Sequence, residues 1–179
     1  ENNDIGVPKT LLRGAETDAA FVLEMGMRGF GQIERLSRVA EPDIAVITNV
    51  GQAHIGILGS RENIAKAKSE ITSNLRCDGV VIIPFGDNLL EKALSKKWSG
   101  RIIRVAIEGF SLNCLGLNDQ HFASQGIEPD YISQIDMQNN FIFFEGSKFK
   151  LPLEGRHNAM NFLMALAVAK ELGLSIKNL

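Results

Sequence analysis

The chain has 179 residues, of which 19 are Lys or Arg and 21 are Asp or Glu, so its formal net charge is −2. Hydrophobic residues make up 45% and charged residues 22%, which is typical of a globular domain and excludes a disordered or collagen-like chain. The balanced charge and the lack of a basic block argue against a dedicated nucleic-acid or membrane-surface binder. The longest apolar stretch, 162–169, is far shorter than the ~20 residues of a membrane-spanning helix. Cys77 and Cys114 lack metal-ligand spacing, which favours a reduced, cytoplasmic protein.

The first part of the chain alternates strand-like and helix-like segments. Short apolar runs rich in β-branched residues and bounded by Gly or Pro predict buried parallel strands at 18–23, 43–47, 79–83 and 101–107. Apolar residues at helical spacing predict helices at 32–39, 62–75 and 88–97, the second with Ser60 as its N-cap. This alternation predicts an α/β fold with a mostly parallel sheet flanked by helices.

The pattern changes from about 122 to 153. Turn residues at 138–139 and 145–147 separate three short strand-like segments, which are 131–137, 140–145 and 148–153. They predict a small antiparallel excursion from the parallel sheet. A turn at 154–158 then leads into a nearly all-apolar helix that runs to Glu171 and stops at Gly173, and we expect it to be buried on most sides.

Two side chains are expected at the carboxyl ends of predicted strands, where ligands collect in open α/β sheets. Glu24 directly follows the run 18–23, and His54 lies in a glycine-containing loop a few residues after the run 43–47. A carboxylate and an imidazole at neighbouring strand ends can share a divalent cation. From the local sequence alone, a helix-capping Glu and a hydrogen-bonded loop His remain the alternative.

Lys68 belongs to the apolar stripe of its predicted helix, because it lies four residues after Ile64 and three before Ile71. A lysine on a buried face needs a charge partner, an escape route for its head group or a chemical change. One such change is reaction of the neutral amine with carbon dioxide to a carbamate, which turns a cation into a metal-binding anion. The alternative is a packed stem with a solvated head group. Lys66 points elsewhere, in a predicted solvated ladder with acidic residues four positions away on either side, Glu62 and Glu70.

Two polar segments near the ends of the chain complete the candidate residues. Asn158 and Asn161 lie three apart on one face of the last predicted helix, and an Asn amide can both donate to and accept from the edge of adenine. Helix capping and a satisfied core amide are the respective alternatives. The segment 2–8 predicts a polar loop that becomes helical near Thr10. The chain has no G-x-x-x-x-G-K-[ST] sequence, so any phosphate loop it uses lies outside it.

Four blocks together resemble the central, ATP-binding domain of the Mur ligases. In the order of the family they are NNDIGVPKTLL (2–12), EMGMRGFGQIERL (24–36), PDIAVITNVGQAHIGILGSRENIAKAKSEI (42–71) and LPLEGRHNAMNFLMALA (151–167). Other branches, such as the folylpolyglutamate synthases, usually have Asp-His where this chain has Ala53-His54. That pair and the NNDIGVP opening resemble the branch that adds D-alanyl-D-alanine to UDP-N-acetylmuramoyl tripeptide through an acyl phosphate.

The resemblance assigns roles to the candidate residues. It implies that Glu24 and His54 bind Mg²⁺, that Lys68 is an N-carboxylysine supporting a second metal ion, and that catalysis depends on Lys68 and His54. It implies that Asn161, with Asn158 beside it, contacts the adenine of ATP. Asn2 and Asn3 are expected near the phosphates and the substrate.

The resemblance also implies the extent of the domain. Residues 1–179 correspond to part of a P-loop-type central domain with an antiparallel segment at about 120–153, whereas the phosphate loop, the N-terminal UDP-binding domain and the C-terminal domain lie outside. The chain begins with Glu1, which favours a start inside a longer protein, and we expect it to be inactive alone. The complete enzyme is expected to be a cytoplasmic monomer that binds neither nucleic acid nor membranes. The alternatives are another ligase of the superfamily, which Ala53 disfavours, and a non-catalytic α/β binding module.

Overall fold

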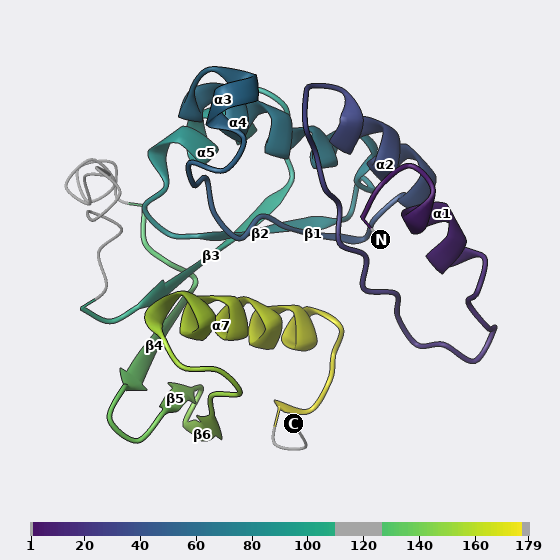
Figure 1. The fold of residues 1–179 in the computed structure, drawn as a ribbon. Helices are drawn as coiled ribbons and strands as arrows, with labels where there is room; N and C mark the ends of the chain where they lie inside the picture. The colour runs from purple at the N-terminus through teal and green to yellow at the C-terminus, as the bar shows by residue number, and fades with distance from the viewer. Residues whose placement is uncertain (1, 110–126, 177–179) are drawn as a thin grey trace. The chain divides into compact units, whose positions relative to one another are not determined.

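A computed structural model describes residues 2–109 and 127–176, and its helices and strands alternate over the first two thirds of the chain (Figure 1). In chain order the elements are α1 (Gly6–Leu11), α2 (Gln32–Ala40), β1 (Ile44–Val46), α3 (Ile55–Leu58), α4 (Arg61–Lys68), the 3-10 helix η1 (Ser69–Asn74), β2 (Val80–Pro84), α5 (Asn88–Leu94), β3 (Arg101–Ile107), β4 (Tyr131–Asp136), β5 (Phe141–Phe144), β6 (Ser147–Lys150) and α7 (Arg156–Glu171). No helix within the described ranges is long and apolar enough to cross a membrane.

The strands form one six-stranded sheet in the order β1-β2-β3-β4-β5-β6. Strand β4 pairs parallel to β3, with Val105 opposite Tyr131, whereas β4–β5 and β5–β6 are antiparallel pairs. The sheet as a whole is mostly parallel, and its antiparallel excursion consists of the β4–β5 and β5–β6 pairs, as predicted. The start of the predicted excursion, 120–126, lies outside the described residues, as does Cys114. Cys77 is an exposed free thiol.

Contacts divide the chain into two compact units. The first unit contains residues 1–45, 50–80 and 89–100, and the second contains 46–49, 81–88 and 101–179. Strands β1 and β2 each begin in the first unit and end in the second. Each unit is therefore assembled from several separate stretches of the chain.

In the first unit, α2 packs against η1, and α4 packs against both. Buried Ile33, Leu36 and Ile64 contribute to its core. The hydroxyl of Ser60 accepts a hydrogen bond from the backbone N–H of Asn63 at 3.2 Å, so the predicted N-cap is confirmed. The predicted helix 62–75 is also present, but it tightens to 3-10 geometry after Lys68.

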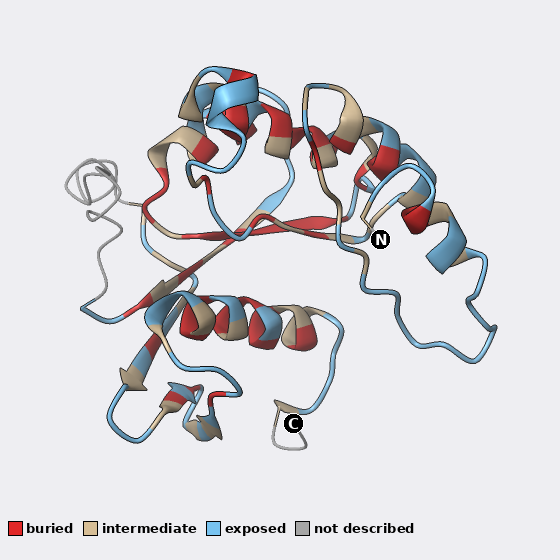
Figure 2. Cartoon of the chain, in the orientation of Figure 1, coloured by how far each residue is buried: buried red, intermediate tan, exposed pale blue. Residues whose placement is uncertain are grey.

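In the second unit, α7 packs on β3, β4 and β5 (Figure 1). The buried residues along α7 and the fully buried strand β2 appear in red in Figure 2. The helix buries one broad face, formed by Ala159, Met160, Leu163, Met164, Leu166, Ala167 and Ala169. Asn161 and Ala165 are exposed, so the helix is less enclosed than its apolar sequence predicts.

The first predicted strand is wrong, because residues 18–23 have no strand structure. A strand needs a neighbour for its backbone groups, and this run pairs with none of the described strands. Val22 is 92% exposed, and Phe21 lies against the backbone of Gly14, where an added Cβ would be 2.1 Å from the Phe21 ring. The sequence also predicts a later start for the first helix, which begins at Gly6 rather than near Thr10, and it does not predict α3.

Candidate functional site

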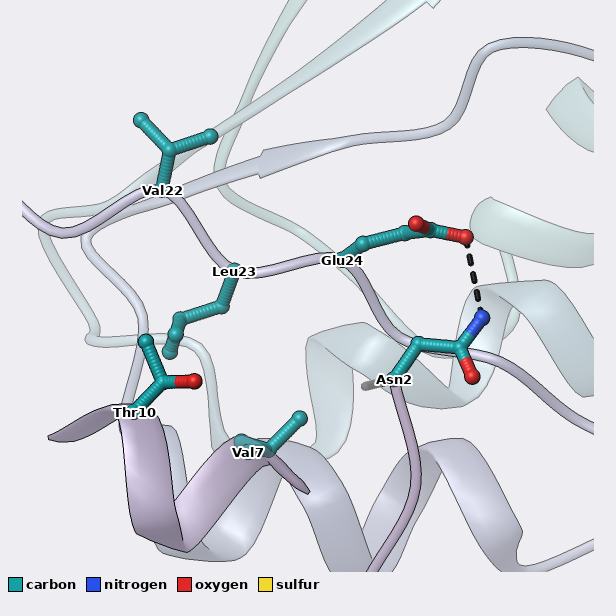
Figure 3. A pocket seen from close by; sticks show the side chains of 6 residues that line it. All are labelled: Asn2, Val7, Thr10, Val22, Leu23 and Glu24. Carbon is teal, nitrogen blue, oxygen red and sulfur yellow. Dashed lines mark hydrogen bonds between the residues drawn. The ribbon is translucent and has the colours of Figure 1, made fainter.

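Glu24 is held in place by the N-terminal loop of the chain, 22 residues away (Figure 3). The Asn2 side chain donates a hydrogen bond from Nδ2 to Glu24 Oε1 at 2.9 Å, and the Asn2 carbonyl accepts one from the Gly26 N–H at 2.8 Å. A Cβ on Gly26 would lie 2.7 Å from the Asn2 side chain, so only glycine permits this close approach. The carboxylate of Glu24 is exposed and has one oxygen oriented by an amide.

A cavity of about 420 Å³ lies beside this pair. Its wall combines the two polar side chains with apolar and hydroxyl groups from α1 and the segment before Glu24 (Figure 3). The residues that line it are Asn2, Val7, Thr10, Val22, Leu23 and Glu24. The Thr10 hydroxyl donates to the Gly6 carbonyl at 2.9 Å. Glu24, to which the family resemblance assigns metal binding, is thus part of the cavity wall.

His54 is exposed and adopts a left-handed backbone conformation, with φ +69° and ψ 9°. Few residues other than glycine adopt this conformation, and those that do are concentrated in turns and functional sites. His54 precedes α3, and its carbonyl accepts hydrogen bonds from Ile57 and Leu58, both at 3.0 Å. The side chain therefore projects from a strained turn rather than from a regular helix.

Hydrogen bonds from α4 hold both ends of the loop that carries His54. Arg61 donates from Nε and Nη2 to the Val50 carbonyl at 3.3 and 3.1 Å. Asn63 donates from Nδ2 to the Leu58 carbonyl at 2.8 Å. Neither Arg61 nor Asn63 is predicted from the sequence, although their position directly after the Ser60 cap and the glycine-containing loop is a signal for such contacts.

Lys68 is half-buried at the last position of α4, on the side that the sequence predicts. Lys66 is exposed, also as predicted, and its Nζ lies 3.5 Å from Asn63 Oδ1. The predicted ladder from Lys66 to Glu70 is wrong. Glu70 is only 4% exposed and binds the Gly31 N–H, because the change to 3-10 geometry after Lys68 turns its side chain away from the α-helical i+4 position.

The remaining candidates are distributed between the two units. Asn3, in the first, accepts hydrogen bonds at Oδ1 from Ile5 and Gly6, at 3.2 and 2.8 Å, and so caps the first turn of α1. Asn158 and Asn161 belong to the second unit, both on α7. Asn158 donates from Nδ2 to the Glu154 carbonyl at 2.7 Å, whereas Asn161 is exposed and is therefore not a core amide.

The second unit has a cavity of about 500 Å³ at the ends of β3 and β4 and the start of α7. It is lined by Glu108, Gly109, Ile135, Asp136, Met137, Gln138 and Arg156. Neither candidate asparagine of α7 is part of this lining, so the cavity gives no separate support to an adenine role for them.

The exposed carboxylate of Glu24 is a donor of the kind that fits a magnesium ion. Mg²⁺ prefers oxygen ligands, keeps several waters and is usually held by one or two carboxylates together with phosphate oxygens. Glu24 offers an exposed, oriented carboxylate, and a carbamate on Lys68 would add a second oxygen donor. Over residues 2–109 and 127–176, no three His, Cys, Asp or Glu side chains form a metal-binding cluster.

Comparisons with known proteins give one consistent family. The model of the Mur ligase middle domain matches residues 1–169. A UDP-N-acetylmuramoyl-tripeptide–D-alanyl-D-alanine ligase from Synechocystis sp. is 38% identical over 178 residues, covering 99% of this chain and 35% of the relative. The enzyme of the same name from Bacillus subtilis is also 38% identical, over 97% of this chain and 34% of the relative. The chain thus spans about a third of these curated relatives.

Solved structures agree with the sequence relatives. A crystal structure of MurF from Acinetobacter baumannii superposes with a TM-score of 0.78 at 31% identity, over 98% of this chain and 36% of that one. MurF from Thermotoga maritima in complex with ADP shares the fold, with a TM-score of 0.62 at 23% identity over 86% of this chain and 33% of that one. The family model of the middle domain matches nearly every residue, so the chain belongs to the Mur ligase family and corresponds to the middle domain of its members.

Proposed function

We propose that this chain is the ATP-binding middle domain of a ligase that joins D-alanyl-D-alanine to UDP-N-acetylmuramoyl tripeptide. The observation that supports this most strongly is the match of nearly the whole chain to relatives of that name at 38% identity. The Ala53-His54 pair and the NNDIGVP opening are in keeping with this branch. The ADP in the Thermotoga maritima structure supports a nucleotide as the co-substrate.

The proposed reaction joins a carboxylate to an amine in two steps. The terminal carboxylate of the tripeptide attacks the γ-phosphorus of ATP, giving an acyl phosphate and ADP. The amine of D-alanyl-D-alanine then attacks the acyl carbon, and the tetrahedral intermediate expels phosphate and loses a proton. Catalysis of such phosphoryl transfer depends mainly on the positioning and neutralisation of charge.

The residues of the first unit would supply that positioning. Glu24 and His54 would hold Mg²⁺, with Glu24 oriented by its hydrogen bond from Asn2. When bound, Mg²⁺ neutralises phosphate charge and so lowers the repulsion between the triphosphate and the attacking carboxylate. Asn2, which is hydrogen-bonded to Glu24, would contact the phosphates and the substrate, whereas Asn3 supports the loop by capping α1.

Lys68 would act as a carbamate. The neutral amine attacks carbon dioxide, a C–N bond forms, and a proton is released, which leaves an anionic side chain in place of a cation. The half-buried position of Lys68 supports this change, because burial makes a positive charge more costly in free energy. The carbamate oxygens would support the second metal ion.

On α7, Asn161 would contact the adenine of ATP. Its exposed amide can donate and accept at once, as recognition of the adenine edge requires. Asn158 would stabilise the start of the helix through its hydrogen bond to the Glu154 carbonyl. We further propose that the whole ligase works as a cytoplasmic monomer.

The test uses the full-length protein and the release of phosphate from ATP. We expect release to require UDP-N-acetylmuramoyl tripeptide, D-alanyl-D-alanine and Mg²⁺ together. Glu24→Gln should abolish most of it, whereas Glu16→Gln, a matched change at an exposed site in the preceding loop, should not. Phosphate release that needs a folate and glutamate instead, or a full-length protein without ATP turnover, would contradict the proposal.

A further inference from the structure

Glu70 is a buried carboxylate to which the proposed reaction gives no role. The residue is 4% exposed, and both of its carboxylate oxygens lie 2.9 Å from one donor, the backbone N–H of Gly31. A carboxylate is seldom buried unless it is paired or hydrogen-bonded, because it loses its hydration. The bond crosses 39 residues of sequence, so it joins two distant segments of the first unit.

Gly31 is the N-cap of α2 and has a left-handed backbone, with φ +75°. In a capping box, the carboxylate that accepts from the N-cap N–H comes from the third residue of the same helix. Here it comes from η1 instead. Within the turn before α2, Gln32 Oε1 accepts from the Arg28 N–H at 2.6 Å, so the chain between Gly26 and α2 is fixed from both sides.

A second hydrogen-bonded tie joins the same two elements. Asn74, at the end of η1, donates from Nδ2 to the Glu34 carbonyl at 3.2 Å and to the Ser37 hydroxyl at 3.0 Å. The 3-10 helix is thus attached to both the start and the middle of α2. Lys68 immediately precedes this 3-10 helix, and Glu24 lies seven residues before Gly31.

We propose that Glu70 is a positioning residue that fixes the segment containing Lys68 relative to the segment containing Glu24. This inference rests on the proposed function, because it takes those two side chains as parts of one metal site. Glu70 reaches Gly31, Gly31 begins α2, and the turn before α2 leads back to Gly26 and the Asn2–Glu24 pair. If this connection is lost, the two proposed metal-supporting groups are no longer fixed relative to each other.

The test measures binding of Mn²⁺ alone to the full-length ligase, by electron paramagnetic resonance of the unbound ion, together with the melting temperature. Glu70→Ala removes the acceptor, and we expect its Mn²⁺ dissociation constant to rise about tenfold, as for the loss of other residues that orient metal ligands. Glu70→Gln keeps one acceptor oxygen and should stay close to wild type. Glu62→Gln, an exposed change on α4, is the matched control and should leave binding unchanged.

Asn74→Ala breaks the second tie and keeps the test decisive if Glu70→Ala does not fold. We expect it to weaken Mn²⁺ binding in the same direction but less. Two results would overturn the inference: melting temperatures that fall without any change in Mn²⁺ affinity, or Glu70→Gln binding as weakly as Glu70→Ala, which would make the charge itself the essential group. Glu24→Gln separates the two proposals. If Glu24→Gln leaves Mn²⁺ binding intact, the proposed metal site is refuted. If Glu24→Gln weakens Mn²⁺ binding but Glu70→Ala and Asn74→Ala do not, only the role of Glu70 is refuted.

Discussion

Replacing Lys68 by Ala distinguishes a metal-supporting carbamate from an ordinary packed lysine. Lys68 is half-buried at the end of α4, and Ala is an excellent helix former, so the free energy of unfolding should fall by no more than about 1 kcal/mol. Loss of a group that supports a metal site lowers activity about 10- to 100-fold, which raises the barrier by about 1.4–2.7 kcal/mol. We therefore expect a large loss of activity in a protein that remains folded.

The assay is the initial rate of phosphate release by the full-length ligase, with and without added acetate. Acetate can enter the vacated space as a surrogate carboxylate and should restore part of the activity of Lys68→Ala. Lys68→Arg should be inactive and not rescued, because its guanidinium stays cationic and fills the space. Lys66→Ala is the control and should be nearly neutral, since Lys66 is exposed and its Nζ is 3.5 Å from its Asn63 contact. Full activity of Lys68→Ala would refute the carbamate.

Four further changes test other parts of the structure. Ser60→Ala removes the acceptor that caps α4 and should lower the free energy of unfolding by about 1 kcal/mol, measured by urea denaturation. Gly26→Ala brings a Cβ to 2.7 Å from the Asn2 side chain, so ligase activity should fall while a far-ultraviolet spectrum stays unchanged. The side-chain and backbone hydrogen bonds from Asn139 lower the pKa of Asp136. The stabilisation from these bonds is present above the ordinary Asp pKa and is lost as the pH falls through the lowered pKa of Asp136. The difference in melting temperature between wild type and Asp136→Asn should therefore shrink in acid. Residues 1–179 expressed alone should show no appreciable ATP hydrolysis or amide formation, and robust turnover would contradict the assignment of the reaction to the longer ligase.

The sequence predicted the elements whose local pattern and tertiary environment agree. The run 79–83 is apolar and β-branched, and β2 is buried along its whole length. The β3 boundaries match the prediction at both ends, and Ser60 caps the helix that it precedes. The run 18–23 is also apolar but pairs with none of the described strands, and the lack of a neighbouring strand is not encoded in its own residues.

Parts of the site could not be predicted because they depend on contacts between distant residues. The Asn2–Glu24 hydrogen bond joins residues 22 positions apart and has no periodic signature. Continuous α-helical spacing past Lys68 predicts that Glu70 forms a solvated ladder with Lys66. The chain instead tightens to 3-10 geometry there and points the carboxylate at Gly31. The placement of Lys68 on the inner side of its helix was predictable, since it follows from Ile64 and Ile71 alone.

The way the chain alternates between the two compact units limits how the domain can be dissected. The backbone passes from one unit to the other after residues 45, 49, 80, 88 and 100, so neither unit is a continuous piece of polypeptide. A single protease cut or a simple truncation therefore cannot release one unit intact, and neither can be grafted onto another protein as one segment. Glu24, His54 and Lys68 belong to one unit and Asn161 to the other. Substitutions can therefore test the proposed metal-binding and adenine-binding residues separately, whereas a protease cut cannot separate them. To express either unit alone, its separate segments would have to be joined by newly designed loops.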